Sequence, residues 1–166
     1  KQNPSLNIHT ELGSNSRLSE IQGFLGAQQV KKAKSIVNQR IKIASMYDKT
    51  LKHTPSTRLL EIPSYIKSSY YKYIIFVNKN IRNKVKKMMY EKFGISLPGE
   101  VYSHLCHSQP VFRKYKSRII KKGDYSFKIA KKISSEQLCL PLYPSLKKSE
   151  IRYVVNSLKK TLKRLT

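Results

Sequence analysis

The stretch Gly13–Gln22, which reads GSNSRLSEIQ, determines how this chain is organised, because it places a polar turn directly in front of a helix. Gly13 suits a tight turn, and Asn15 or Ser16 can cap the helix that follows. Glu20 adds a carboxylate near the positive end of that helix. We therefore expect a helix that begins near Ser16. Its first apolar stripe consists of Leu18, Ile21 and Leu25.

The spacing of apolar residues predicts further helices and only a few short strands. The expected helices are a run from about Ile36 to Leu51, Asn80 to Phe93, Tyr125 to Gln137, and about Lys147 to Leu162. The expected strands are Tyr70 to Val77, Ile95 to Leu97 and Leu138 to Leu140, and His53 to Ser69 is expected to be a loop. Asn80 is the expected N-cap of its helix and Gly94 its left-handed C-terminal residue. Strands and helices that do not alternate regularly indicate the α+β class, with a small antiparallel sheet covered by helices.

Four motifs farther along the chain accompany the opening stretch. They are NQRIKIASMYDKTL at 38–51, SSYYKYIIFV at 68–77, GEVYSHLCHSQPVF at 99–112 and LCLPLYPSL at 138–146. Together with the G-x-N-x-R-x-x-E-x-Q pattern of residues 13–22, their order and spacing resemble the DegT/DnrJ/EryC1/StrS family of PLP-dependent sugar aminotransferases. Members of this family make amino sugars from nucleotide-linked keto sugars.

This resemblance implies a fold and a domain organisation. The chain would be the C-terminal small domain of a fold-type I aminotransferase, preceded by a long helical segment. Residues 1–15 would be the remaining edge of the large PLP domain, residues 16–54 the connecting helices, and residues 55–166 the small C-terminal α+β domain. The segment with the Schiff-base lysine would lie before Lys1, and no lysine of this chain has the family's context for it. We therefore expect the chain alone to be an inactive fragment.

The resemblance also implies a cofactor, partners and binding residues. The whole enzyme would be a homodimer that uses pyridoxal 5'-phosphate (PLP) to pass an amino group from an amino acid such as glutamate to a nucleotide-linked keto sugar. Asn15 would reach the phosphate of the PLP bound in the partner subunit, with Gly13 providing the turn that exposes it. His107 and Tyr102 would line the substrate side of the active site. From the residues alone, Asn15 could instead only cap the helix, and His107 could only order its loop.

The charge of the chain suggests a different class of protein. Lys and Arg number 34 against 9 Asp and Glu, which gives a net charge of +25. Such a charge attracts polyanions and is typical of nucleic-acid-binding proteins, although it specifies neither fold nor function. The lysine pairs lie along almost the whole chain, whereas a dedicated binder more often gathers them on one face. Two alternatives therefore remain beside the enzyme fragment: a pseudoenzyme remnant with an interaction role, and a basic nucleic-acid-binding protein.

Cysteine and hydropathy patterns limit the location of the protein. Cys106 and Cys139 are too few for a disulfide framework. No apolar run approaches the roughly eighteen residues that a membrane-spanning helix needs. We therefore expect a cytoplasmic protein without a membrane segment. His104, Cys106 and His107 could ligate a metal, but the paired spacing of structural zinc sites is missing, so we do not predict a metal site.

Overall fold

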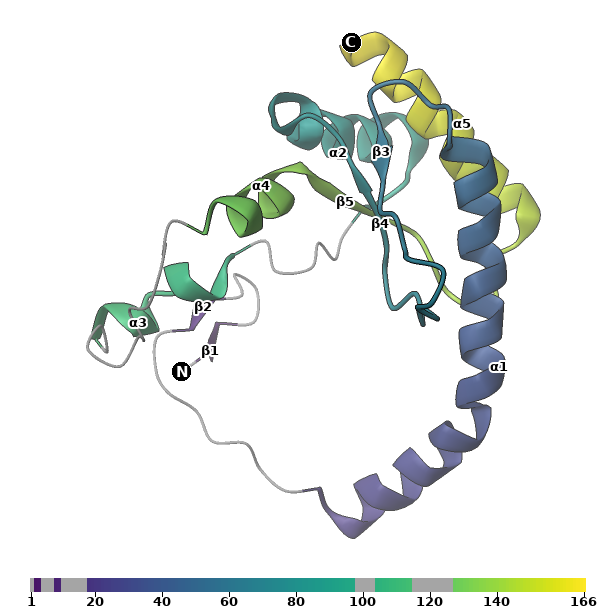
Figure 1. Cartoon of the computed structure of the whole chain (residues 1–166), viewed down its shortest axis with the longest axis vertical. Coiled ribbons are helices and arrows are strands. Elements are labelled where there is room, and N and C mark those ends of the chain that lie inside the picture. Colours follow the sequence, from purple (N-terminus) through teal and green to yellow (C-terminus); the bar gives the residue numbers. More distant parts are fainter. Residues whose placement is uncertain (1, 4–7, 10–17, 98–103, 115–126) are drawn as a thin grey trace.

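A small antiparallel sheet lies at the centre of the fold. The computed structural model describes residues 2–3, 8–9, 18–97, 104–114 and 127–166. The sheet has the strand order β3-β4-β5, with β3 (Arg58–Leu59), β4 (Tyr73–Phe76) and β5 (Gln137–Leu140). The helices are α1 (Glu20–Leu51), α2 (Lys79–Phe93), α3 (Val111–Lys114), α4 (Lys128–Glu136) and α5 (Lys148–Leu165), with a 3-10 turn η1 (Cys106–Ser108). β1 (Gln2–Asn3) and β2 (Ile8–His9) form a separate antiparallel pair. This arrangement confirms the expected α+β class (Figure 1).

The middle strand, β4, is shorter than the sequence predicts. Ile75 pairs with Leu59 on one side and with Leu138 on the other, so the aromatic and branched residues of β4 lie in the centre of the sheet. The strand was expected to begin at Tyr70, but Tyr70 has a φ of 46°, in the left-handed region that an extended strand cannot use. The regular pairing therefore begins only at Tyr73.

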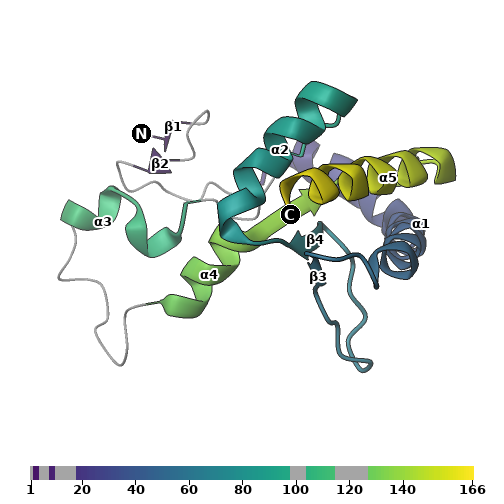
Figure 2. The same cartoon turned by 90° about the horizontal axis from the view of Figure 1, so that it is seen from above.

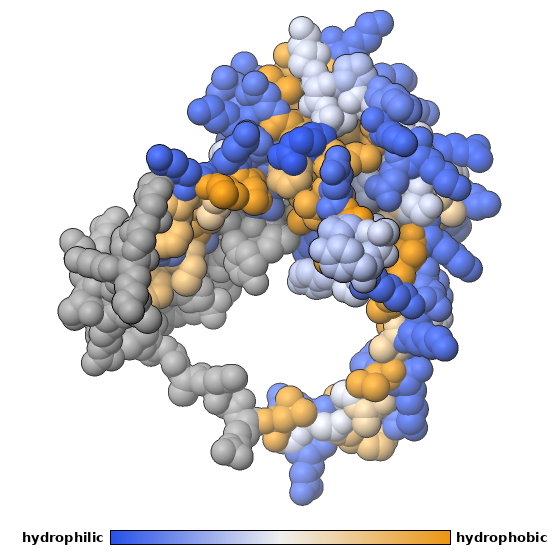
Figure 3. Space-filling model, in the orientation of Figure 1, coloured by the Kyte–Doolittle hydropathy of each residue, from blue (hydrophilic) through white to orange (hydrophobic). Residues whose placement is uncertain are grey.

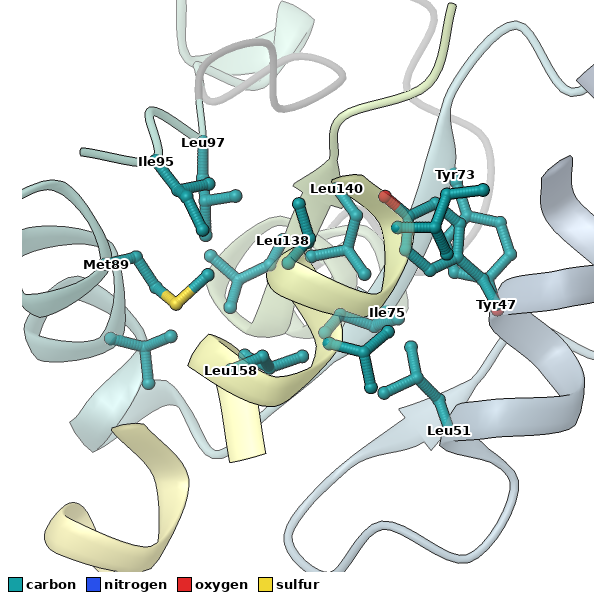
Figure 4. Packing of buried hydrophobic residues seen from close by; sticks show 14 of the residues in the cluster. Tyr47, Leu51, Tyr73, Ile75, Met89, Ile95, Leu97, Leu138, Leu140 and Leu158 are labelled. Atoms are coloured by element: carbon teal, nitrogen blue, oxygen red, sulfur yellow. The ribbon is translucent and has the colours of Figure 1, made fainter. Parts of the chain in front are cut away.

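Helices α2 and α5 pack side by side over the sheet, and α5 also contacts α1 (Figures 1 and 2). Figure 4 shows Ile75 and Leu138 of the sheet close to Met89 of α2 and Leu158 of α5. The inner face expected for the last helix is confirmed, because Ile151, Val154, Val155, Leu158 and Leu162 are all buried. This core joins the sheet and the three longest helices into one unit.

The long helix α1 is a single helix of 32 residues and begins later than expected. Its N-cap is Ser19, whose Oγ accepts the N–H of Gln22 at 3.4 Å while the Ser19 N–H donates to Gln22 Oε1 at 3.0 Å. The expected caps, Asn15 and Ser16, are therefore wrong. A capping box needs Glu or Gln three residues after the cap, and only Ser19 has one at that spacing.

The bounds of α2 differ from the sequence prediction for similar reasons. Its cap is Asn78 rather than Asn80, because Asn78 Oδ1 accepts the N–H of Asn80 at 2.9 Å. The expected left-handed residue at the end of the helix is confirmed, since Gly94 has a φ of 64°. The N–H of Ile95 then bonds to the Met89 oxygen at 3.0 Å. Ile95 is therefore used to end the helix, and the expected strand from Ile95 to Leu97 does not form, although both end residues are buried.

The expected helix from Tyr125 to Gln137 is shorter in the structure. Phe127 has a φ of 47° and precedes the first turn of α4, while Gln137 already belongs to β5. Within the described part of the chain, no helix is long and apolar enough to cross a membrane.

The two buried tyrosines at the junction of α1 and β4 predict a loss of stability in alkali. Burial raises the pKa of both Tyr47 and Tyr73 above the usual value of about 10. The folded chain therefore keeps these protons longer than the unfolded chain, and their stabilising contribution, complete below about pH 10, is lost as the pH rises further. Urea unfolding at about pH 9 and about pH 11 measures the loss. Between these pH values the double variant Tyr47→Phe/Tyr73→Phe should lose less free energy of unfolding than the unaltered chain. The difference should be up to ~1.4 kcal/mol per pH unit for each tyrosine replaced.

A matched control separates this effect from the general titration of lysines. Tyr65 and Tyr90 are exposed by 86% and 66%. The variant Tyr65→Phe/Tyr90→Phe should therefore follow the unaltered chain across the same pH range. Equal pH dependence in both double variants would contradict the assignment.

Candidate functional site

The loop that contains His107 is built around the short turn η1. The Ser108 N–H donates to the Leu105 oxygen at 3.0 Å, and the Ser108 Oγ donates to the same oxygen at 2.7 Å. The Gln109 N–H closes the turn on the Cys106 oxygen at 3.1 Å, and the Phe112 N–H then bonds to the Gln109 oxygen. These bonds lead the chain from η1 directly into α3. The His-x-Gln-Pro motif is thus a defined turn and not an extended segment.

His107 lies against Phe127, the residue that precedes α4. The two rings are stacked, with centroids 4.1 Å apart and an interplanar angle of 14°. Such contacts contribute roughly 0.5–1.5 kcal/mol beyond the area that they bury. A stack occupies a face of the imidazole, whereas both ring nitrogens lie on its edge, where hydrogen bonds are made. The contact therefore orients His107 without using the atoms that could bind a hydroxyl or a phosphate.

Two residues of this loop have structural roles that the sequence analysis did not assign. Gln109 is only 6% exposed, and its Nε2 lies 3.5 Å from the His104 oxygen. Val111 is buried as well and anchors the start of α3. Phe127 was expected only as an apolar helix position, but it holds His107 from outside the helix. Contacts between segments twenty residues apart leave no periodic signal in the sequence, so this role could not be read from it.

The predicted site residues fall on both described and undescribed parts of the chain. His107 is described, whereas Asn15, Gly13 and Tyr102 lie outside the described residues. The alternative that Asn15 only caps the helix is nevertheless excluded, because the N-cap of α1 is Ser19. Of the two cysteines, Cys106 is exposed and Cys139 is buried in β5. Across the residues that the structure describes, no group of three or more His, Cys, Asp or Glu side chains could hold a metal ion.

Comparison with known proteins identifies the family. Residues 2–159 match the DegT/DnrJ/EryC1/StrS aminotransferase family, and the chain belongs to this family. It is 30% identical over 145 residues to the dTDP-4-dehydro-2,3,6-trideoxy-D-glucose 4-aminotransferase of Saccharopolyspora spinosa, a match that covers 87% of this chain and 34% of that protein. It is also 25% identical over 150 residues to the UDP-4-amino-4,6-dideoxy-N-acetyl-beta-L-altrosamine transaminase of Campylobacter jejuni, covering 89% of this chain and 38% of that protein.

Solved structures show the same fold. The chain is similar to NtdA of Bacillus subtilis with bound cofactor PMP, with a TM-score of 0.74 and 23% identity over 91% of this chain and 34% of that one. It is also similar to the aminotransferase TlmJ of Streptoalloteichus hindustanus, with a TM-score of 0.71 and 24% identity over 95% of this chain and 40% of that one. The chain thus spans little more than a third of the length of the relatives that it matches.

The contact between His107 and Phe127 predicts different results for two substitutions. Phe127→Ala removes the ring but keeps a side chain at a φ of 47°, whereas Phe127→Gly removes the ring and relieves the left-handed backbone. Both variants should move the NMR signals of the His107 ring protons downfield, because the ring current of Phe127 is gone. The Gly variant should be more stable to urea than the Ala variant by about 1 kcal/mol. His107 signals that stay in place in both variants would show that the stack does not exist in solution.

Proposed function

We propose that these 166 residues work as the C-terminal part of a PLP-dependent nucleotide-sugar aminotransferase. The observation that supports this most is the family match over residues 2–159, together with a fold shared with the aminotransferase TlmJ and with NtdA, whose structure holds PMP. PLP would carry an amino group from an amino acid such as glutamate to a keto sugar. The protein would act in the cytoplasm as a homodimer, and its substrate would be a nucleotide-linked sugar of the kind named for two of its relatives.

The first half of α1 supports the proposal that a further domain covers this part of the chain. Leu18, just before the helix, is exposed by 72%, and the apolar side chains of the first half of α1 are exposed as well: Ile21 by 76%, Phe24 by 65%, Leu25 by 57% and Val30 by 72%. Figure 3 shows orange patches among blue and white ones along the lower arm of α1. Solvent exposure of so many large apolar residues on one helix is costly, because each gains roughly 1.5–3 kcal/mol on full burial. We propose that the large PLP domain packs here.

Two glycines on the same arm agree with this proposal. Gly26 has no atom within 4 Å of the position that a Cβ would occupy, and Gly23 has only Leu18 Cδ2, at 4.0 Å. Each Gly weakens a helix by about 1 kcal/mol relative to Ala, and no contact within the described chain calls for a small residue there. Close approach of another domain would use both positions. In this organisation, residues 1–15 belong to the edge of the large domain, residues 16–54 connect the domains, and residues 55–166 form the small domain.

The proposed binding residues have complementary tasks. Asn15 would donate its amide to the phosphate of the PLP held by the partner subunit, and Gly13 would allow the turn that exposes it. His107 and Tyr102 would face the sugar nucleotide, where imidazole and phenol can hydrogen-bond hydroxyl or phosphate oxygens. The stack on Phe127 gives His107 one fixed ring orientation for this purpose. None of these residues would supply the covalent attachment of PLP, which in this proposal comes from a lysine in a segment before residue 1.

The first test therefore concerns the chain alone. With added PLP and borohydride, the 166-residue chain should show only scattered, substoichiometric lysine modification. Intact mass and peptide mapping measure the extent and the site. One lysine modified to completion would contradict the proposal that this part cannot transaminate by itself.

The second test uses the whole enzyme, obtained by expressing the chain with the reading frame that lies upstream of it. That enzyme should absorb visible light with PLP and should aminate a nucleotide-linked keto sugar with glutamate as donor. An upstream frame without a lysine in the family's context would instead support a remnant. A protein that binds PLP but transfers no amino group to any nucleotide sugar would refute the proposed function.

In the same enzyme, Asn15→Ala should weaken PLP retention while the thermal melt of the apoenzyme stays unchanged. A hydrogen bond to a charged phosphate contributes about 1.5–3 kcal/mol, which is roughly a tenfold to hundredfold change in affinity. Ser19→Ala is the matched control, since it removes the observed cap and should lower the free energy of unfolding by about 1 kcal/mol without changing PLP affinity. Unchanged PLP affinity in Asn15→Ala would rule out the phosphate contact.

A further inference from the structure

A cleft lies where the start of α2 faces the end of α4 and the edge strand β3. It consists of two adjoining hollows of about 660 Å³ and about 560 Å³ that share Asn78, Asn80 and Glu136 as lining residues. The first hollow extends to Arg58 of β3, and the second to Lys79 and to Lys131 and Lys132 of α4. We call this the α2–α4 cleft. It shares no lining residue with the loop that carries His107.

The charge of the α2–α4 cleft is strongly positive. Its charged side chains are those of Arg58, Lys79, Lys131 and Lys132, opposed by Glu136. The first hollow is also lined by Thr166, whose terminal carboxylate adds a second negative group in the 166-residue chain. All four cationic residues are exposed, and Glu136 is half-buried. Cations from three elements, β3, α2 and α4, line these two adjoining hollows. A concave wall concentrates their field, which raises the local concentration of anions.

Arg58 is held in place before any ligand arrives. Its guanidinium carbon lies 4.0 Å from the centroid of the Phe76 ring, and its Nη2 lies 3.6 Å from Glu136 Oε2. These two contacts use one face of the guanidinium and one of its nitrogens, and the side chain remains 60% exposed. A guanidinium has five N–H donors, so donors remain for an anion in the hollow. A side chain that is already ordered loses less conformational entropy when it binds.

The N-terminal end of α2 adds a second source of positive potential. The cap is complete, because Asn78 Oδ1 accepts the N–H of Asn80, and the Asn78 oxygen accepts the N–H groups of Ile81 and Arg82 at 3.1 Å. Asn78 and Asn80 line both hollows, so the positive N-terminal end of this fifteen-residue helix lies at their junction. Lysines act as point charges for phosphate, and an arginine fork suits two phosphate oxygens. The size of the cleft exceeds what a single small anion would fill.

We propose that the α2–α4 cleft binds a ligand with several linked phosphate groups, at a site separate from the proposed aminotransferase centre. Arg58 contacts one phosphate, which the positive potential at the N-terminal end of α2 also attracts, and Lys79, Lys131 and Lys132 contact the next. The shared chemistry is a run of phosphates, which either a nucleic-acid backbone or a free polyphosphate supplies. This gives part of the +25 charge a defined location.

The test compares two variants that remove the same charge from different places. Lys79→Gln/Lys131→Gln changes the cleft, and Lys31→Gln/Lys32→Gln changes an exposed stretch of α1 outside it. All four lysines are exposed, so both variants should keep the fold, which circular dichroism checks. Titration with tripolyphosphate near physiological salt should give saturable binding at one site. The cleft variant should weaken this binding at least tenfold, and the α1 variant by less than twofold.

A second probe identifies the source of the phosphates. A short oligothymidylate that displaces tripolyphosphate from the unaltered chain, but binds the cleft variant poorly, would show that a nucleic-acid backbone fits the site. If the oligothymidylate does not displace tripolyphosphate, although tripolyphosphate still binds, the site would be assigned to free polyphosphates. Equal weakening in the two variants, or binding that never saturates, would overturn the proposal. None of these outcomes depends on transamination, so the proposed function is tested separately.

Discussion

The contact between Tyr47 of α1 and Tyr73 of β4 fixes how the long helix meets the sheet. Their rings are stacked with centroids 4.8 Å apart, and both residues are buried. Each hydroxyl has a partner: Tyr73 donates to Asp48 Oδ1 at 2.6 Å, and Tyr47 donates to the Pro141 oxygen at 2.9 Å. A buried hydroxyl without a partner would cost about 1–3 kcal/mol, so these bonds select one position of the helix. Two rings therefore join α1, β4 and the end of β5.

This contact divides α1 into two parts with different tasks. From Ile43 to Leu51 the helix contributes buried residues to the core, whereas its first half carries its apolar side chains into solvent. Figure 1 shows this first half leading away from the sheet. Because a helix transmits its direction rigidly over short distances, the junction at Tyr47 also determines where the exposed arm points. The buried second half of α1 thus determines the position of the exposed first half, whose apolar side chains are available to another domain.

The amount of the fold that the sequence predicts depends on how local each signal is. The inner stripe of α5, the left-handed Gly94 and the core of β4 follow from periodicity and residue type, and the structure confirms them. The caps at Ser19 and Asn78 were missed because several polar residues compete for each helix start, and the one with the best hydrogen-bond geometry succeeds. The Gln three residues after Ser19 is the sequence signal that would have identified this cap.

The candidate site could be predicted only in part. The resemblance to the family led to His107, but the roles of Gln109 and Phe127 depend on contacts between separate segments. The α2–α4 cleft was hidden for the same reason, because Arg58, Lys79 and Lys131 are distant in sequence and each lies beside other charged or polar residues. The net charge predicted an attraction for polyanions but did not indicate where on the chain they would bind. Asn15, Gly13 and Tyr102 remain predictions from the sequence.

Amide hydrogen exchange along α1 tests the central claim most directly, namely that its first half is a surface for the rest of an aminotransferase. In the 166-residue chain alone, amides from about Gln22 to Ser35 should exchange rapidly, while those from Ile43 to Leu51 should be strongly protected. In the full-length enzyme, the first group should become protected by at least an order of magnitude, because the large domain covers it. Equal exchange of the first half in both proteins would contradict the account.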